Sequence, residues 1–458
     1  MRTALSNQGV RSTEAAKGRG TLQNKIHDED RAAHDWFRFV LSFPPHLVRD
    51  YVRELGFDES KTVLDPFCGT GTTVVECRKL GIPSVGIEAN PMAFFATSVK
   101  VDWGCDPKLF LKHAHDIADS AAAELSNQGI QDIPFFASKN ANAENRLRKL
   151  PAEAEGILLK NSISPLPLHK TLVLLDAIER HPCKRHVSHA KLALANVLVR
   201  SIGNLHFGPE VGVGKRKPDA PVISAWLAVC KRMATDLCSL RKLPGAPVDL
   251  HRGDSRRLLG LLKPNTIDGV ITSPPYPNEK DYTRTTRLES VILGFLRSKR
   301  DLREMKQNFL RSNTRNVYKG DDDDQWVAGN HKIQEIARRI ESRRAALGKT
   351  SGFERLYHRV TKLYFGGMKR HLSELATILR PGARLAYVVG DQASYLRVMI
   401  HTGELLAEIA TSLGYELVRI DLFRKRLATA TRNQLREEIV VLRWPGKSAA
   451  RRCRRIAE

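Results

Sequence analysis

The chain's 458 residues can bury a large core and suggest two or three domains, and 42% hydrophobic with 27% charged residues is ordinary for a globular protein. Lysine and arginine number 74 against 50 aspartates and glutamates, and the net charge of +24 favours nucleic acid as a partner over a merely solvated basic surface. The seven cysteines include no CxxC pair, which argues against a disulfide framework or a zinc ribbon.

The two ends of the chain are polar and basic. Residues 1–30 contain few large hydrophobes and predict a mobile basic tail, and residues 447–458 predict a second one. The N-terminus has no apolar signal core, and no apolar run approaches the length of a membrane span. We therefore expect a soluble, cytoplasmic protein with no membrane partner.

A short apolar strand enters a glycine turn within residues 62–73. Gly69 and Gly71 let the backbone approach a ligand closely, and a helix that begins near Thr72 presents free N–H groups. The next strand ends at Glu88, at the distance where an acidic residue accepts hydrogen bonds from ribose hydroxyls. The pattern predicts a nucleoside site.

This turn differs from the common phosphate-binding loops. A P-loop needs a lysine before its serine or threonine, and a dinucleotide site needs a third glycine where the helix opens; neither is present. Asp65, just before the turn, would repel a polyphosphate and suits a cationic ligand. S-adenosylmethionine, with its ammonium and sulfonium, fits these residues, whereas a plain strand-to-helix turn leaves Glu88 without a role.

Residues 106–245 change to apolar positions at helical spacing, and the segments 203–209 and 212–217 read as loops. A cluster of histidines and a cysteine lies in this insert, but its spacing matches no common zinc pattern, and Lys184 and Arg185 oppose cation binding. We therefore predict no metal. The cluster is His181, Cys183, His186 and His189.

The alternating strand and helix pattern resumes in residues 246–300. A strand that starts at Val248 leads into Asp254 and Ser255, which could hold an amino group and a hydroxyl of a bound nucleoside. Capping of a following helix is the alternative.

The next strand, 267–271, ends abruptly in Thr-Ser-Pro-Pro-Tyr, residues 272–276. Its prolines cannot donate to a sheet or continue into a helix, so the strand must stop there. The proline carbonyls and the hydroxyl of Ser273 can accept hydrogen bonds, and Tyr276 offers a flat apolar face with a polar tip. These groups suit a planar molecule that carries an amino group.

Residues 301–358 form a second insert. Its acidic run, Asp321–Asp324, predicts a solvated loop rather than a cation site. In residues 359–446, a helix, a strand and another helix precede two strands that we expect to close the sheet as a hairpin.

Both motifs resemble those of the amino-methyltransferases of DNA, which methylate exocyclic amines of bases. Residues 65–73 match the family's cofactor motif, Gly86–Pro91 match its ribose-binding strand end, and His34–Val48 resemble the segment that helps to hold the methionine end of the cofactor. Ser273–Tyr276 match the catalytic motif in the form typical of the cytosine N4 branch, since the adenine branch usually has Asp or Asn first.

The resemblance implies a Rossmann-like α/β methyltransferase fold, with a mostly parallel seven-stranded sheet, an antiparallel C-terminal hairpin and helical inserts. Residues 31–105 would bind the cofactor, and residues 246–300 would carry catalysis. The expected catalytic residues are Ser273, Pro274, Pro275 and Tyr276. The expected cofactor-binding residues are His34, Asp65, Phe67, Gly69, Gly71, Thr72 and Glu88, to which the nucleoside argument adds Asp254 and Ser255.

The implied activity is methyl transfer from S-adenosylmethionine to the N4 amine of cytosine in double-stranded DNA, with the base flipped onto Tyr276. A restriction enzyme would be a possible partner in a restriction-modification or defence setting. The two inserts compete as the target-recognition region. Alternatives are adenine-N6 methylation of DNA, methylation of a guanine amine in RNA, and a non-catalytic DNA-binding module, which would leave both ligand motifs without a purpose.

Overall fold

The computed structural model describes residues 26–39, 42–132, 147–207, 211–278, 280–427 and 434–446. Most of the predicted N-terminal tail and the whole C-terminal tail lie outside these residues. Where the first tail is described, the prediction is wrong, because residues 28–30 form a short 3₁₀ helix with Asp30 buried and bonded to Arg49 at 2.6 Å. Within the described residues, no helix is long and apolar enough to cross a membrane.

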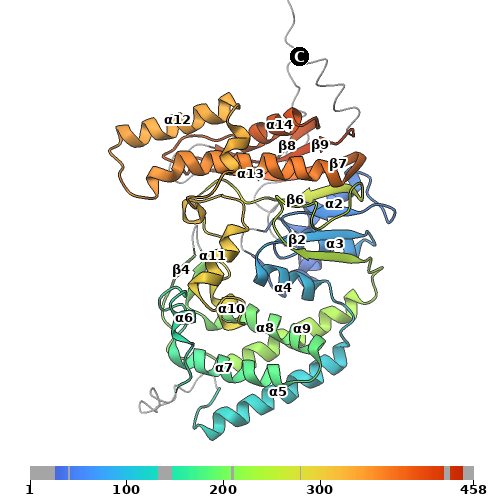
Figure 1. The fold of residues 1–458 in the computed structure, drawn as a ribbon. Helices are drawn as coiled ribbons and strands as arrows, with labels where there is room; N and C mark the ends of the chain where they lie inside the picture. The colour runs from blue at the N-terminus through green and yellow to red at the C-terminus, as the bar shows by residue number, and fades with distance from the viewer. Residues whose placement is uncertain are drawn as a thin grey trace, which may run out of the picture.

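Seven strands form one sheet in the order β5-β2-β1-β6-β7-β9-β8 (Figure 1). The first five of these are parallel, and β9 and β8 run antiparallel at the edge. The predicted mostly parallel sheet with a C-terminal hairpin is therefore confirmed. The strands are β1 (Val63–Asp65), β2 (Ser84–Glu88), β5 (Val248–Arg252), β6 (Ile267–Thr272), β7 (Leu379–Gly390), β8 (Glu416–Leu427) and β9 (Gln434–Arg443).

Alternate residues of the sheet face two helical layers, as the period of two in a strand requires. In β7, Leu385, Tyr387 and Val389 pack with one hydrophobic cluster, whereas Ala386 and Val388 pack with another. The first cluster includes α13 (Tyr357–Ile378) and α14 (Thr402–Ser412), and the second includes α2 (Pro45–Glu54) and α3 (Thr72–Lys79).

The helices of the first insert lie together at one end of the molecule (Figure 1). They pack around a hydrophobic core that also takes in residues of the N-terminal segment and of residues 92–99. In α9, Trp226, Cys230, Met233 and Leu237 are buried at helical spacing, and Asp132 accepts hydrogen bonds from the first N–H groups of this helix. The helices of the insert are α5 (Pro107–Asn127), α6 (Ala152–Glu155), α7 (Pro165–Arg180), α8 (Lys184–Val197) and α9 (Val222–Leu240).

One part of the insert differs from the prediction. The segments expected as loops form a short antiparallel hairpin, β3 (Leu205–Phe207) and β4 (Val211–Val213). Three residues in each strand are too few to show an alternating pattern in the sequence.

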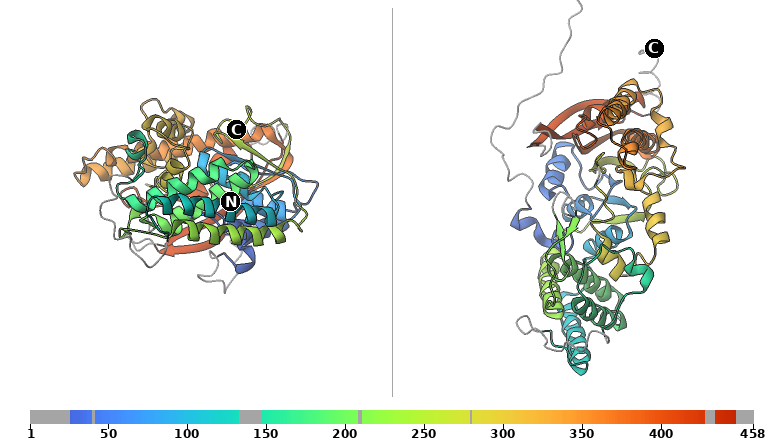
Figure 2. Two further views of the ribbon diagram at one scale, coloured as in Figure 1. Left: turned by 90° about the horizontal axis from the view of Figure 1, so that it is seen from below. Right: turned by 90° about the vertical axis from the view of Figure 1, so that its left-hand side faces the viewer.

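The second insert runs from α11, which packs beside α6 of the first insert, to α12, which lies along α13 (Figure 1). Figure 2 shows that the molecule is elongated, with the first insert at one end and α12 to α14 at the other. The remaining helices are α1 (Arg31–His34), α4 (Pro91–Lys100), α10 (Arg287–Ile292), α11 (Lys299–Gln307) and α12 (His331–Ala346).

Candidate active site

The predicted turn and the Ser-Pro-Pro-Tyr motif meet at one edge of the sheet. They follow β1 and β6, which are adjacent and parallel, and ligands of open α/β sheets bind beyond the carboxyl ends of such strands. Between them lies a cavity of about 450 Å³. All four predicted catalytic residues line it, and so do five of the predicted cofactor residues. These are Ser273, Pro274, Pro275 and Tyr276, and Phe67, Gly69, Thr72, Glu88 and Ser255.

Glu88 lies at the end of β2, facing the cavity. Its two carboxylate oxygens accept hydrogen bonds from the backbone N–H groups of Gly69 and Asn90, both at 2.7 Å. Burial raises the pKa of Glu88 to about 7. These two bonds fix the carboxylate and leave lone pairs that can accept ribose hydroxyls.

The turn itself is shaped for close approach. Gly71 has a φ of 85°, and a Cβ there would lie 2.8 Å from Cγ2 of Thr97, so the position admits no side chain. Thr97 also donates to the Gly69 carbonyl at 3.0 Å. Thr70 lines the cavity, and its buried hydroxyl has no hydrogen-bond partner among the described residues. A polar ligand would supply that partner.

Asp65 lies beneath the turn rather than in the cavity lining. Its Oδ1 accepts hydrogen bonds from the Thr272 hydroxyl at 2.6 Å and from the Phe67 N–H at 3.1 Å. Burial raises its pKa to about 6. Asp65 therefore joins the cofactor turn directly to the residue before the catalytic motif.

The catalytic motif is anchored to two strands of the sheet. Ser273 donates its hydroxyl hydrogen to the carbonyl of Val388 in β7 at 3.1 Å. Tyr276 donates its phenol hydrogen to Oε1 of Glu437 in β9 at 2.8 Å. Burial, together with Glu437, raises the pKa of Tyr276 well above its usual value, so the phenol stays protonated.

Sequence comparisons agree with this geometry. Residues 10–96 match the N6/N4 family model described as DNA methylase. The Type II methyltransferase M.BsoBI of Geobacillus stearothermophilus is 24% identical over 463 residues, covering 91% of this chain and 85% of that protein. The Type II methyltransferase M.AvaI of Anabaena variabilis is 23% identical over 455 residues, covering 91% and 88%.

A shorter match carries higher identity. The Type II methyltransferase M.MjaII of Methanocaldococcus jannaschii is 39% identical over 59 residues, or 13% of this chain and 11% of that protein. Together these matches support placing the chain in the DNA amino-methyltransferase family. Among solved structures, the match to TrmN of Thermus thermophilus covers 90% of this chain and 52% of the TrmN chain. Its TM-score is 0.27 and its identity 12%, so this similarity carries no argument about the fold.

Similarity to this family, together with the fold, implies S-adenosylmethionine as the methyl donor. The cavity fits that group, because the fixed Glu88 carboxylate lies at its cofactor end, Gly71 of the turn admits no side chain, and the buried Thr70 hydroxyl lacks a partner among the described residues. The ionised form of Glu88 favours a ligand that carries positive charge.

Besides Asp65, three predicted cofactor residues are outside the cavity lining: His34, Asp254 and Gly71. His34 is buried against Glu76 at 2.8 Å, and burial lowers its pKa to about 3, so it is neutral and committed to that carboxylate. The N-terminal segment reaches the cavity instead through Phe39, Ser42 and Phe43.

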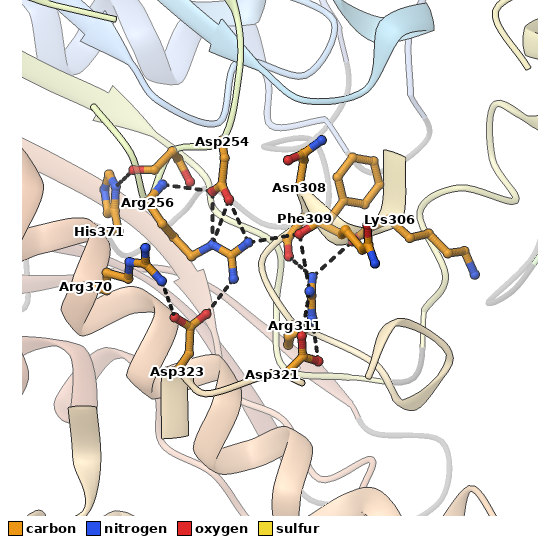
Figure 3. A network of polar contacts seen from close by, with 12 residues as sticks. Asp254, Arg256, Lys306, Asn308, Phe309, Arg311, Asp321, Asp323, Arg370 and His371 are labelled. Carbon is orange, nitrogen blue, oxygen red and sulfur yellow. Dashed lines mark hydrogen bonds and ion pairs between the residues drawn. The ribbon is translucent and has the colours of Figure 1, made fainter. Parts of the chain in front are cut away.

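Asp254 is the second, because its carboxylate is held by the side chain of Arg256, with Nη2 to Oδ2 at 2.7 Å (Figure 3). Its Oδ1 also accepts the Arg256 N–H at 2.9 Å, and a turn follows, not the helix that the capping alternative expected. Only its neighbour Ser255 lines the cavity. Gly71, the third predicted residue outside the lining, shapes the turn from behind.

The acidic run is not the solvated loop that the sequence predicted. Asp323 is buried and pairs with both Arg256 and Arg370, the latter at 3.2 Å, and Asp321 pairs with Arg311 at 2.7 Å (Figure 3). Arginines occupy these carboxylates, so the two aspartates are not free to bind a cation. The run fastens the second insert to the turn after β5.

Sequence reasoning missed two groups of cavity residues. One is Glu437 with its ion-pair partner Arg424, which stand opposite each other in β9 and β8. The other is Asn308, Phe309 and Leu310 after α11, in the second insert. Glu437 could have been found in the sequence, because a carboxylate at the start of an apolar strand is unusual. No sequence feature distinguishes Phe309.

The histidine cluster of the first insert does not converge on a metal position. His189 lies at 2.9 Å and 3.1 Å from two backbone carbonyl oxygens. Among the described residues, His27, Asp30 and His46 do bring ligand atoms within 4.8 Å of one another, but the Arg49 guanidinium on Asp30 opposes a cation there.

Proposed function

We propose that this protein transfers a methyl group from S-adenosylmethionine to the exocyclic N4 amine of cytosine in duplex DNA. The observation that carries the proposal is the hydrogen bond from Ser273 to the Val388 carbonyl. Because the hydroxyl hydrogen is committed to the sheet, the Ser273 oxygen presents lone pairs and acts as an acceptor. An acceptor beside a stacking tyrosine suits an amino group on a planar ring.

The target base must leave the duplex to reach this cavity. Tyr276 supplies an apolar ring for stacking, and its bond to Glu437 fixes the orientation of that ring. Ser273 Oγ would hold one amine hydrogen, and the Pro274 carbonyl would accept the other. With both hydrogens held, the nitrogen lone pair turns out of conjugation and becomes nucleophilic.

The cofactor supplies an electrophilic methyl group on a sulfonium. Glu88 would hold its ribose, and the turn around Gly69 would cradle the rest, as the family motif implies. What the chain contributes is position and electrostatics, which suffice for a direct displacement when the reacting atoms are about 3–3.5 Å apart. No cysteine nucleophile is needed.

The choice of cytosine rests on the Ser-first form of the motif, which resembles the N4 branch of the family. Adenine-N6 methylation uses the same geometry and is the main alternative, and a guanine amine in RNA is the other. The similarity to Type II methyltransferases supports a restriction-modification setting, in which a restriction enzyme reads the same sequence.

Mass spectrometry of nucleosides tests the assignment. Duplex DNA that has been incubated with the protein and labelled S-adenosylmethionine should yield labelled N4-methylcytosine after digestion. Ser273→Ala and Tyr276→Ala should abolish the label while cofactor binding survives. Labelled methyladenine would overturn the base assignment, and label in tRNA but not in duplex DNA would overturn the substrate.

A further inference from the structure

A second groove lies between α12 and the turn that precedes α14. It is lined by four arginines and two glutamates, and both glutamates are already paired. Glu335 pairs with Arg338, and Glu341 pairs with Arg344 outside the groove, each at 2.7 Å. The arginines of the lining are Arg338, Arg339, Arg343 and Arg397.

Three of these guanidinium groups are uncompensated. Arg339, Arg343 and Arg397 are exposed, and none has a carboxylate at ion-pair distance within the part of the chain that the structure describes. Arg339 and Arg343 stand one helical turn apart, about 6 Å along α12. A cluster of unpaired guanidiniums attracts anions, and its fork of N–H donors matches phosphate oxygens.

The backbone that presents Arg397 adopts a conformation rare for its residue types. Leu396 and Arg397 both have left-handed φ values, 53° and 61°, although neither is glycine. The buried Tyr395 just before them donates its phenol hydrogen to the Ser312 carbonyl of the second insert at 2.9 Å. The turn is thus held in place, with Arg397 directed to the groove.

The same turn connects the groove to the catalytic cavity. Gln392 and Ser394 line the cavity, and Arg397 follows Ser394 by three residues, a span of at most about 10 Å. The second insert also walls the cavity through Phe309, whereas no described residue of 106–245 lines it. Because this turn is part of the cavity wall, the backbone of a duplex that places a base in the cavity would come close to it.

We propose that the groove of Arg339, Arg343 and Arg397 binds backbone phosphates of the duplex next to the flipped base. The second insert, 301–358, then positions the DNA, and the first insert does not. This inference rests on the proposed function, because it takes duplex DNA as the substrate. Asp321 and Asp323 of the acidic run do not oppose it, since both are already paired with arginines.

The experiment is the salt dependence of duplex binding. For Arg339→Ala/Arg343→Ala/Arg397→Ala, the dissociation constant for a mixed-sequence duplex should rise roughly tenfold at moderate salt. The slope of log Kd against log salt should fall by about 0.9 for each phosphate that the variant no longer neutralises. Replacing the same three residues with lysine should keep most of the slope, because a point charge still neutralises phosphate.

A matched variant removes three charges from the first insert. Lys112, Lys231 and Lys242 are exposed there, and their triple alanine variant should bind duplex with the wild-type slope. Equal slopes for wild type and the groove variant would overturn the inference, as would an equal loss in both triple variants, which would indicate net charge alone. If the wild-type protein neither binds nor methylates duplex DNA, both the proposed function and the proposed role of the groove are wrong. Cofactor affinity shows whether each variant is folded.

Discussion

The phenol end of Tyr276 is held by the Glu437 carboxylate, which lies in no recognisable sequence motif. The Glu437 carboxylate accepts the phenol hydrogen and is itself paired with Arg424, so the tyrosine ring is fixed at two ends, by the prolines and by β9. A ring that must receive a flipped base gains from such a fixed orientation, because positioning carries most of the rate in this type of transfer.

We predict that Glu437→Ala lowers kcat by about tenfold to a hundredfold, the equivalent of one hydrogen bond to a charged group. Cofactor affinity should not change, and Glu437→Gln should recover most of the loss, because its amide oxygen can still accept the phenol hydrogen. Single-turnover methylation measures the effect. In a Tyr276→Phe background the same substitution should have little further effect; a full additional loss would show that Glu437 acts by another route.

Glu88 gives the site a pH dependence of known sign. Burial raises its pKa in the folded protein from 4.5 to about 7, so the folded state binds this proton more tightly than the unfolded state does. The associated stability is present below about pH 4.5 and is lost as pH rises to about 7, by up to about 3 kcal/mol.

We therefore predict that Glu88→Gln makes the cofactor-free protein more stable than wild type near pH 8 but not near pH 5, although it weakens cofactor binding. Urea unfolding at the two pH values, with calorimetric titration of the cofactor, measures both effects. A stability difference that is the same at both pH values would show that Glu88 does not titrate in this range.

At the scale of elements, the pair formed by Arg256 and Asp323 joins the turn after β5 to the second insert across 67 residues of sequence (Figure 3). Both side chains are buried, and Arg370 shares the Asp323 carboxylate. Removal of one member of a buried ion pair leaves the other charge without compensation, which costs more than the pair contributes.

We predict that Asp323→Ala destabilises the protein by about 3 kcal/mol. Its exposed neighbour Asp322 provides the matched control, and Asp322→Ala should stay within about 0.5 kcal/mol of wild type. Denaturant unfolding of the two variants makes the comparison. If both variants behave alike, the Arg256 guanidinium is satisfied by Asp254 alone and the insert is fastened elsewhere.

The elements that the sequence predicted well are those with local signals. A glycine turn and two prolines after an apolar run each depend on residues close together in the chain. The roles of Glu437 and Asp323 were not predicted, because their partners are set by strand register and by packing between segments far apart in the chain. Asp254 misled for a different reason: its chemistry suits a nucleoside, but Arg256, only two residues further on, already binds its carboxylate.

At the scale of the whole molecule, the core of the first insert and the cofactor turn share one helix. Met92, Ala96 and Val99 of α4 belong to the core of the first insert, whereas Thr97 of the same helix bonds to the Gly69 carbonyl in the cofactor turn. Trp36 also joins the two parts, because it packs in the insert core and donates to Asp236 of α9 at 2.8 Å.

Because α4 belongs to both parts, we predict that the insert and the sheet unfold in a single calorimetric transition. S-adenosylmethionine should raise the midpoint temperature of that transition by mass action. Trp226 is fully buried at the centre of the insert core, so Trp226→Ala should cost about 3–5 kcal/mol and lower that one transition. The contrary result is a trace with two peaks, of which Trp226→Ala lowers one and the cofactor raises the other. It would mean that the first insert folds as an independent domain and that α4 transmits nothing between its core and the cofactor turn.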